Sequence, residues 1–232
     1  RFMLNKLSTI FGVCPRQLRA FKKMYPTETP DFWVPNPVQK FSGPEVRPPE
    51  PDRPITFVNV GRYDYQKGQD ILIRAFAQLR RDRPDVQLRL VGYGSDEPDL
   101  RRQIDALGLG PAVTLEYYPT TPEIPLGSSD IFVSASRWEG WPLAICEALR
   151  FGLPVVSTDC DFGPSDILTD RRLGRLVSAG DEGALTSEMR YYCDNIAAER
   201  AHAAFRREAI DAYSAERVVH VHSAALKSAV GR

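Results

Sequence analysis

The sequence predicts an α/β protein in which a parallel sheet is covered by helices on both faces. From Ile55 onward, short apolar segments of strand length alternate with amphipathic segments, a rhythm typical of strands joined by crossover helices. Glycine-containing turns follow the apolar segments, so we expect them to gather at the carboxyl edge of the sheet, where such proteins bind ligands. With 232 residues, the chain can form one large domain or a domain with an appendage.

The composition excludes several classes of protein. The 30 basic and 30 acidic residues give a formal net charge of zero, which leaves no electrostatic footprint for nucleic acid. No apolar run approaches the ~20 residues that a membrane helix needs. The segment Arg1–Leu7 is too short and turns polar too soon for a signal peptide. Four scattered cysteines without metal or redox spacing indicate reduced cysteines in a cytosolic protein.

The first part of the chain is predicted to form a stub and a linker. Residues 1–27 indicate a short strand and then a basic helix that begins near Pro15, because proline is favoured in the first helical turn. Prolines are dense between Pro26 and Pro54, so we expect an extended linker there rather than a packed element. A domain boundary is expected near Ser42–Asp52. Since the chain begins with an arginine, we expect a fragment of a longer protein.

Strands and helices are expected in turn after this linker. Apolar runs predict strands at Ile55–Val60, Gln87–Val91, Val113–Glu116, Ile131–Val133, Pro154–Thr158 and Arg175–Val177. Helical spacing, with glycine or proline at the boundaries, predicts helices at Gln69–Arg80, at Glu97–Leu107, from Pro142 to Phe151 and after Gly163-Pro164. Two or three further amphipathic helices are expected from about Asp181 to the end.

Two glutamates eight positions apart frame the most informative stretch. Glu139 lies in a Gly/Pro turn, and Glu147 lies on the helix that Pro142 is expected to start as its first residue. The free N–H groups of that helix end form an anion site between the two acids, which suits a ligand with hydroxyls and phosphate. Alternatively, Glu139 is a first-turn acid stabilised by the helix dipole and Glu147 is solvated, although apolar neighbours make an exposed Glu147 less natural.

Two cations stand on the loop after the first predicted strand of the sheet. Gly61–Gly68 contains Arg62, which can bind phosphate with two parallel hydrogen bonds, and Lys67, which acts as a point charge. Together they would neutralise a diphosphate without a metal. The alternative is that both are solvated loop residues, as most lysines and arginines are. The loop lacks the Gly-x-Gly-x-x-Gly pattern that a nicotinamide-dependent enzyme would need.

Several segments, taken in order, resemble the retaining glycosyltransferases of family 4, which have the GT-B fold of two Rossmann-like lobes. They are Asn59-Val60-Gly61-Arg62, Gln66-Lys67-Gly68, Leu90-Val91-Gly92-Tyr93-Gly94, Ser136-Arg137-Trp138-Glu139-Gly140-Trp141-Pro142, Glu147-Ala148 and Gly152-Leu153-Pro154-Val155-Val156. The resemblance runs from about Ile55 to Leu185. Asp159–Ile167 is similar to a bacterial subgroup that extends polysaccharide or lipid-linked oligosaccharide chains, although that subgroup more often has glutamate at Asp166.

The resemblance implies an organisation for the chain. Pro35-Asn36-Pro37 is similar to the segment where such enzymes pass from the N-terminal to the C-terminal lobe. Residues 1–41 would then be a remnant of the N-terminal lobe, 42–53 a proline-rich linker, 54–197 the Rossmann-like domain that binds the nucleotide sugar, and 198–232 the C-terminal helices. The rest of the N-terminal lobe would be missing from this chain.

The resemblance also implies a role for each site residue. Arg62 and Lys67 would hold the donor diphosphate and stabilise it as the leaving group, and Glu139 would bind the hydroxyls of the transferred sugar. Glu147 would accept hydrogen bonds from the ribose. The remaining donor-binding positions, for the distal phosphate, the base and the sugar pocket, would be Gly61, Gly92, Gly94, Tyr117, Gly140, Trp141, Leu143 and Ala144. Tyr117 or Tyr118 would stack on the base, unless it is a half-buried core tyrosine.

The implied activity is transfer of a hexose from a UDP- or GDP-sugar to a saccharide or lipid-linked saccharide, with retention of configuration and without metal or cofactor. The isolated chain would transfer weakly or not at all. The protein would be cytoplasmic, or peripherally associated with the inner face of the membrane. The alternatives are a non-catalytic sugar-nucleotide-binding module and a GT-B-type epimerase or phosphorylase.

Asp159-Cys160-Asp161 follows a predicted strand, and two such carboxylates can hold a divalent metal. Its flanking pattern differs from that of the sugar transferases that use such a pair. We therefore interpret the segment as a turn, in which Asp161 or Ser165 caps the short helix after Pro164.

Overall fold

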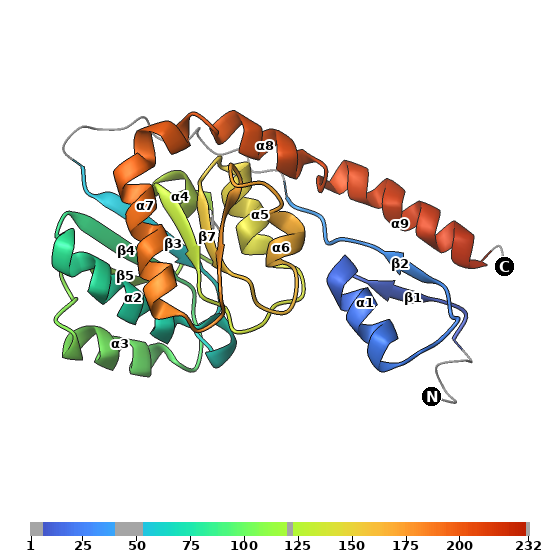
Figure 1. Ribbon diagram of the computed structural model, residues 1–232, viewed down its shortest axis with the longest axis horizontal. Coiled ribbons are helices and arrows are strands. Elements are labelled where there is room, and N and C mark those ends of the chain that lie inside the picture. The colour runs from blue at the N-terminus through green and yellow to red at the C-terminus, as the bar shows by residue number, and fades with distance from the viewer. Residues whose placement is uncertain (1–6, 40–52, 120–122, 231–232) are drawn as a thin grey trace.

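The computed structural model of the chain describes residues 7–39, 53–119 and 123–230. Within these residues the main body is a parallel sheet of six strands in the order β5-β4-β3-β6-β7-β8 (Figure 1). The strands are β3 Ile55–Val60, β4 Val86–Val91, β5 Val113–Glu116, β6 Ile131–Ser134, β7 Val155–Thr158 and β8 Gly174–Val177. The predicted fold class and all six predicted strands are confirmed.

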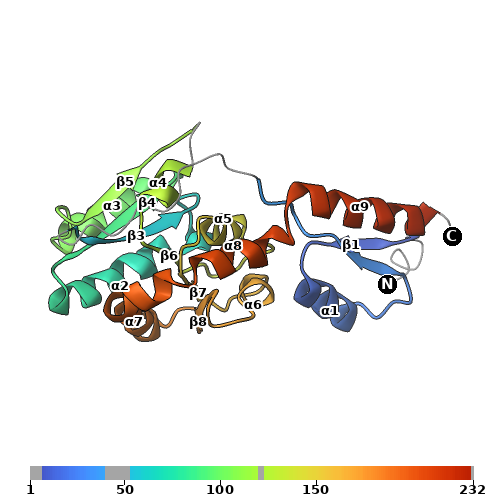
Figure 2. The same cartoon turned by 90° about the horizontal axis from the view of Figure 1, so that it is seen from above.

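Helices cover both faces of this sheet (Figure 2). On one face lie α2 Gln69–Asp82, α3 Glu97–Ala106 and α7 Glu182–Arg200. On the other face lie α4 Glu123–Gly127, α5 Leu143–Arg150, α6 Pro164–Ile167 and α8 Ala203–Asp211. Successive residues of a strand point to opposite faces, so Phe57 enters the first core and Val58 the second. The four central residues of β3, 56–59, are therefore buried between the two layers of helices.

The helices agree with the prediction in most places. After Asp181 the chain forms α7, α8 and a long α9 at Ala215–Val230, within the predicted number. The prediction for Pro142 was wrong in detail: its ψ of 89° is not helical, so it is the N-cap of α5 and Leu143 is the first helical residue. The five-residue helix α4 and the 3₁₀ turn η2 at Tyr65–Lys67 were not predicted, because a helical pattern cannot be recognised in so few residues.

The N-terminal residues form a small separate unit. The predicted strand and helix are β1 Ile10–Gly12 and α1 Pro15–Met24, with Pro15 in the first turn as predicted. The predicted extended linker was wrong for its first part, because β2 Asp31–Trp33 pairs in parallel with β1. The prolines around β2 do not interrupt its three-residue ladder. The boundary expected near Ser42–Asp52 lies outside the described residues.

Helix α9 joins the two parts of the molecule, running from the main body across the N-terminal unit (Figures 1 and 2). Val38 is 1% exposed and its N–H donates to the carbonyl of Tyr213, 2.8 Å away, just before α9. A ring nitrogen of His222 lies 3.0 Å from the carbonyl oxygen of Pro35. No helix among the described residues is long and apolar enough to span a membrane.

Candidate functional site

A pocket of about 310 Å³ opens at the carboxyl ends of β3 and β6, against the start of α5. It is lined by Asn59, Val60, Gly61, Lys67, Phe132, Ser134, Ser136, Glu139, Trp141, Pro142, Leu143, Ala144 and Ile145. Six residues of the predicted site are therefore brought together: Gly61, Lys67, Glu139, Trp141, Leu143 and Ala144. The other six, Arg62, Gly92, Gly94, Tyr117, Gly140 and Glu147, do not line this pocket.

Lys67 and Glu139, which both line the pocket, form an ion pair. The Lys67 Nζ lies 2.7 Å from Glu139 Oε1, and the two side chains are 22% and 7% exposed. Gly68 makes this approach possible, because its φ of 65° is left-handed and a Cβ there would lie 2.1 Å from the carbonyl oxygen of Ala135. Only glycine lets the loop after β3 pass this close to the loop after β6.

A buried hydroxyl network fixes the Glu139 carboxylate from behind. Ser136 Oγ donates to the same Oε1 at 2.7 Å, and Thr158 Oγ1 donates to the carbonyl of Ser136 at 2.6 Å. The Glu139 N–H donates to the carbonyl of Asp161 at 2.6 Å. Oε1 is thus held by two donors, while no donor among the described residues reaches Oε2. That oxygen is free to accept a hydrogen bond from a ligand.

Sequence reasoning gave no role to Ser136 or Thr158. Ser136 stands three residues before Glu139, in the segment Ser136–Pro142 that resembles the glycosyltransferases, and this spacing was the signal in the sequence. Thr158 is the last residue of β7 and meets Ser136 only through the pairing of β6 with β7. No local sequence pattern predicts such a contact.

The start of α5 presents free donors to the pocket. The N–H groups of Ile145 and Cys146 donate back to the carbonyl of Pro142, at 3.0 and 3.4 Å. The N–H groups of Leu143 and Ala144 have no backbone acceptor among the described residues. Unsatisfied N–H groups at a helix N-terminus attract anions, so this part of the pocket can hold a phosphate.

The structure separates the two predicted cations. Lys67 lines the pocket, whereas the Arg62 side chain is 64% exposed, with Nη2 3.2 Å from Asp64 Oδ2. Arg62 directly follows Gly61, a pocket residue, but does not itself line the pocket. A phosphate in the pocket has Lys67 beside it, while Arg62 must leave Asp64 to reach it.

Glu147 lies one turn further along α5, on the helix side that carries Leu143 and Ala144. Its side chain is half-buried, and this burial raises the pKa of its carboxyl. No described residue donates a hydrogen bond to that carboxylate. The solvated alternative for Glu147 is therefore not what the structure shows.

The predicted base-binding end lies at the carboxyl ends of β4 and β5. A Cβ at Gly92 would lie 1.9 Å from the carbonyl oxygen of Gly61, so Gly92 lets the loops after β3 and β4 touch. Gly94 does the same against Tyr63, at 2.2 Å. Tyr117 is 58% exposed and meets Tyr93 edge-on, with ring centroids 5.2 Å apart, so it is not a core tyrosine.

The Asp159-Cys160-Asp161 segment contacts the N-terminal unit. Asp159 Oδ1 lies 2.8 Å from Nη1 of Arg16 on α1. The predicted cap was wrong: Gly163 is the N-cap of α6 without a side-chain hydrogen bond, and Ser165 Oγ instead accepts from Arg16. The reason is that α1 packs across this loop and binds its polar groups. Among the described residues, no group of three or more His, Cys, Asp or Glu side chains could hold a metal.

The sheet and this edge define a Rossmann-like α/β protein whose site lies at the carboxyl ends of its strands. Residues 45–209 match the family of glycosyl transferases group 1. The match covers more than half of the chain, which therefore belongs to this family. The architecture is that of GT-B glycosyltransferases.

Individual relatives agree with this assignment. The uncharacterized glycosyltransferase MJ1059 of Methanocaldococcus jannaschii is 41% identical over 114 residues, which are 49% of this chain and 28% of that protein. The poly(glycerol-phosphate) alpha-glucosyltransferase of Bacillus subtilis is 27% identical over 174 residues, which are 75% of this chain and 26% of that protein.

A solved structure extends the likeness to the N-terminal unit and α9. The pneumococcal O-GlcNAc transferase GtfA, in complex with UDP and GlcNAc, matches with a TM-score of 0.81 at 16% identity. The match covers 99% of this chain and 46% of that chain. At this identity the likeness shows the fold alone. The chain spans less than half the length of each of these three proteins.

Proposed function

We propose that this chain is the C-terminal, donor-binding lobe of a retaining, metal-independent family 4 hexosyltransferase. Its donor would be a UDP- or GDP-sugar, and its acceptor a saccharide or lipid-linked saccharide in polysaccharide synthesis. The observation that carries the proposal is the convergence of Lys67, Glu139 and the free N–H groups of α5 in one pocket. Such a pocket offers positive charge to a diphosphate and a fixed carboxylate to sugar hydroxyls.

The donor would lie along the edge of the sheet. Its distal phosphate would meet the N–H groups of Leu143 and Ala144, and its sugar hydroxyls would donate to the free Oε2 of Glu139. The ribose would donate to Glu147, whose carboxylate has no partner among the described residues. The base would lie toward Tyr117, at the ends of β4 and β5.

The reaction that fits this arrangement is a same-face displacement. The acceptor hydroxyl oxygen bonds to the anomeric carbon while the bond from that carbon to the diphosphate oxygen breaks. The hydroxyl proton passes to the departing diphosphate. Lys67, with Arg62 turned inward from the rim, would stabilise the charge that develops on this leaving group.

The relatives support the class of substrate. The Bacillus protein is a glucosyltransferase acting on poly(glycerol-phosphate), and the pneumococcal protein was crystallised with UDP and GlcNAc. Because the chain spans less than half of each, we propose that a further N-terminal lobe completes the enzyme and supplies part of the acceptor site. We place the protein in the cytoplasm or at the inner face of the membrane, and its four free, buried cysteines suit a reducing compartment.

Calorimetric titration of the chain with UDP-glucose, UDP-GlcNAc and GDP-mannose tests the proposal. We expect at least one to bind with a dissociation constant below 1 mM, and nucleoside alone to bind more weakly because it lacks the diphosphate. No binding at millimolar concentration by any of the three would refute the proposed function. A bound donor that is not transferred after restoration of an N-terminal lobe would favour a non-catalytic module.

A further inference from the structure

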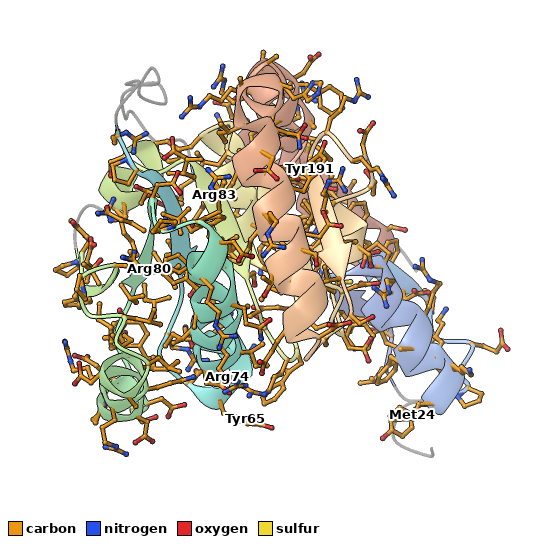
Figure 3. All side chains as sticks on the ribbon, turned by 60° about the vertical axis from the view of Figure 1, so that its left-hand side comes forward. Met24, Tyr65, Arg74, Arg80, Arg83 and Tyr191 are labelled. Atoms are coloured by element: carbon orange, nitrogen blue, oxygen red, sulfur yellow. The ribbon has the colours of Figure 1, made fainter. Side chains whose placement is uncertain are left out.

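Two exposed aromatic side chains stand together beside the pocket. Tyr65 and Trp138 are 65% and 47% exposed, and their ring centroids lie 5.9 Å apart at an interplanar angle of 52°. Single exposed aromatics are common on protein surfaces, whereas a contacting pair from two different loops indicates a surface built for contact. Figure 3 shows Tyr65 at the lower rim of the molecule, below the first turn of α2.

Contacts within the protein hold the Tyr65 ring and the backbone of Trp138 in place. The guanidinium of Arg137 covers the Tyr65 ring, with Cζ 3.9 Å from the centroid, and Nη1 donates to the Tyr65 carbonyl at 2.6 Å. Arg137 is itself fixed by two hydrogen bonds to Asp70, at 2.9 and 2.8 Å. Gln66 Nε2 donates to the carbonyl of Trp138 at 2.9 Å. A surface fixed in advance loses little entropy when it binds.

The position of these rings relates them to the Lys67–Glu139 pair. Tyr65 precedes Lys67 by two residues, and Trp138 directly precedes Glu139. Through Arg137 and Asp70 the Tyr65 ring is tied to the first turn of α2, on one face of the sheet, whereas Leu143 and Ala144 begin α5 on the other. A donor with its phosphate at α5 and its sugar at Glu139 would therefore present that sugar toward the aromatic pair.

We propose that Tyr65 and Trp138 form a stacking platform for one pyranose ring of the saccharide acceptor. This inference rests on the proposed function. A pyranose has an apolar face of C–H groups that packs on an aromatic ring, and hydroxyls at its edge that suit the polar tips of tyrosine and tryptophan. The nucleotide base is assigned elsewhere, because the ends of β4 and β5 carry the separate pair Tyr93 and Tyr117.

The test compares Tyr65→Ala and Trp138→Ala with the control Leu107→Ala, because Leu107 is a large apolar residue that is 44% exposed just after α3 and has no role in the site. Maltotriose, chitotriose and mannotriose serve as probes, with binding read by saturation-transfer NMR and titration. We expect the wild type to bind at least one of them with millimolar affinity. Each platform variant should weaken that binding at least tenfold, whereas Leu107→Ala should keep it within twofold. UDP titrated into the same variants should bind Tyr65→Ala and Trp138→Ala as it binds the wild type.

Three results would overturn the platform: no binding of any probe to a wild type that binds UDP-sugar, unchanged probe binding in both variants, or loss of UDP affinity in both. The last would assign the rings to the base. A wild type that binds a probe through these rings but binds no sugar nucleotide would overturn the proposed function instead. Circular dichroism confirms that each variant is folded, which the exposure of both side chains leads us to expect.

Discussion

The Nζ of Lys67 lies 2.7 Å from Oε1 of Glu139, joining the loop after β3 to the loop after β6. The two residues are 72 positions apart, and Glu139 is almost completely buried. Each of the two charges neutralises the other. A diphosphate that approaches Lys67 and a sugar that approaches Glu139 would therefore meet a preassembled pair rather than two separate side chains.

The first prediction concerns the coupling within this pair. Lys67→Ala leaves a buried carboxylate without its cation, so we expect the free energy of unfolding to fall by about 1–3 kcal/mol. Lys67→Ala/Glu139→Gln should lose less than the sum of the two single variants, because the unpaired charge is gone. Urea denaturation measures both effects, with the exposed Lys227→Ala as control. Strictly additive losses would argue against the coupling.

Ser136 is predicted to position Glu139 for the sugar rather than to hold the nucleotide. Removal of one hydrogen bond in Ser136→Ala should weaken a UDP-sugar by about 0.5–1.5 kcal/mol and leave UDP unchanged. Ser136→Thr keeps the hydroxyl and should restore part of the affinity. Ser129→Ala is the matched control. Ser129 is also 2% exposed, but it lies before β6 and its hydroxyl donates to the carbonyl of Pro125. Equal losses for UDP and UDP-sugar would contradict this role.

Glu147 is predicted to lower the stability of the folded protein and to strengthen the binding of UDP. Burial raises the pKa of its carboxyl, so ionisation in the folded state is unfavourable and stability falls as pH rises from its ordinary pKa through the raised one. Glu147→Gln should therefore melt at a higher temperature at neutral pH. The same variant should bind UDP more weakly than the wild type. Its affinity for UDP should also lack the rise with pH that the wild type shows as Glu147 ionises. Melting curves and titrations between pH 5 and 8 measure both, and unchanged UDP affinity would exclude the ribose contact.

Glu116 provides a prediction at acid pH. Burial alone raises the pKa of Glu116, but hydrogen bonds from Arg89 and Thr114 outweigh it and lower that pKa to about 2. The folded pKa is depressed, so the stabilisation is present above the ordinary pKa of glutamate and disappears as pH falls through about 2. Glu116→Gln should flatten the decline of melting temperature between pH 5 and 2, compared with the exposed control Glu208→Gln. Parallel curves for both variants would speak against this role.

Sequence patterns predicted the sheet well because a strand that packs against covering helices needs an apolar run with clear ends. Ile55–Val60 and Val113–Glu116 were predicted at their observed bounds. The three-residue strand Asp31–Trp33 was missed, since its pairing with β1 depends on tertiary contact and its prolines suggest a linker. Local patterns find elements but not the partners that make a short element stable.

The sequence predicted which residues contribute to the site but not how they are arranged in space. Lys67 and Arg62 carry the same charge, so the sequence does not distinguish them. Lys67 faces the pocket because of the left-handed backbone conformation of Gly68 and the 3₁₀ turn at Tyr65–Lys67. The hydrogen bond from Thr158 to Ser136 arises from strand pairing, and no spacing reveals it. The exposure of Trp138 and the burial of Trp141 are likewise set by contacts from other elements, such as Trp33.

The most direct test is a crystal structure of this chain with a bound UDP-sugar, or GDP-sugar if calorimetry favours it. The pyrophosphate is predicted within hydrogen-bond distance of Lys67 Nζ and of the N–H groups of Leu143 and Ala144, with the sugar on Glu139 Oε2. A nucleotide sugar bound at another edge of the sheet, with the Lys67–Glu139 pocket empty, would contradict the account.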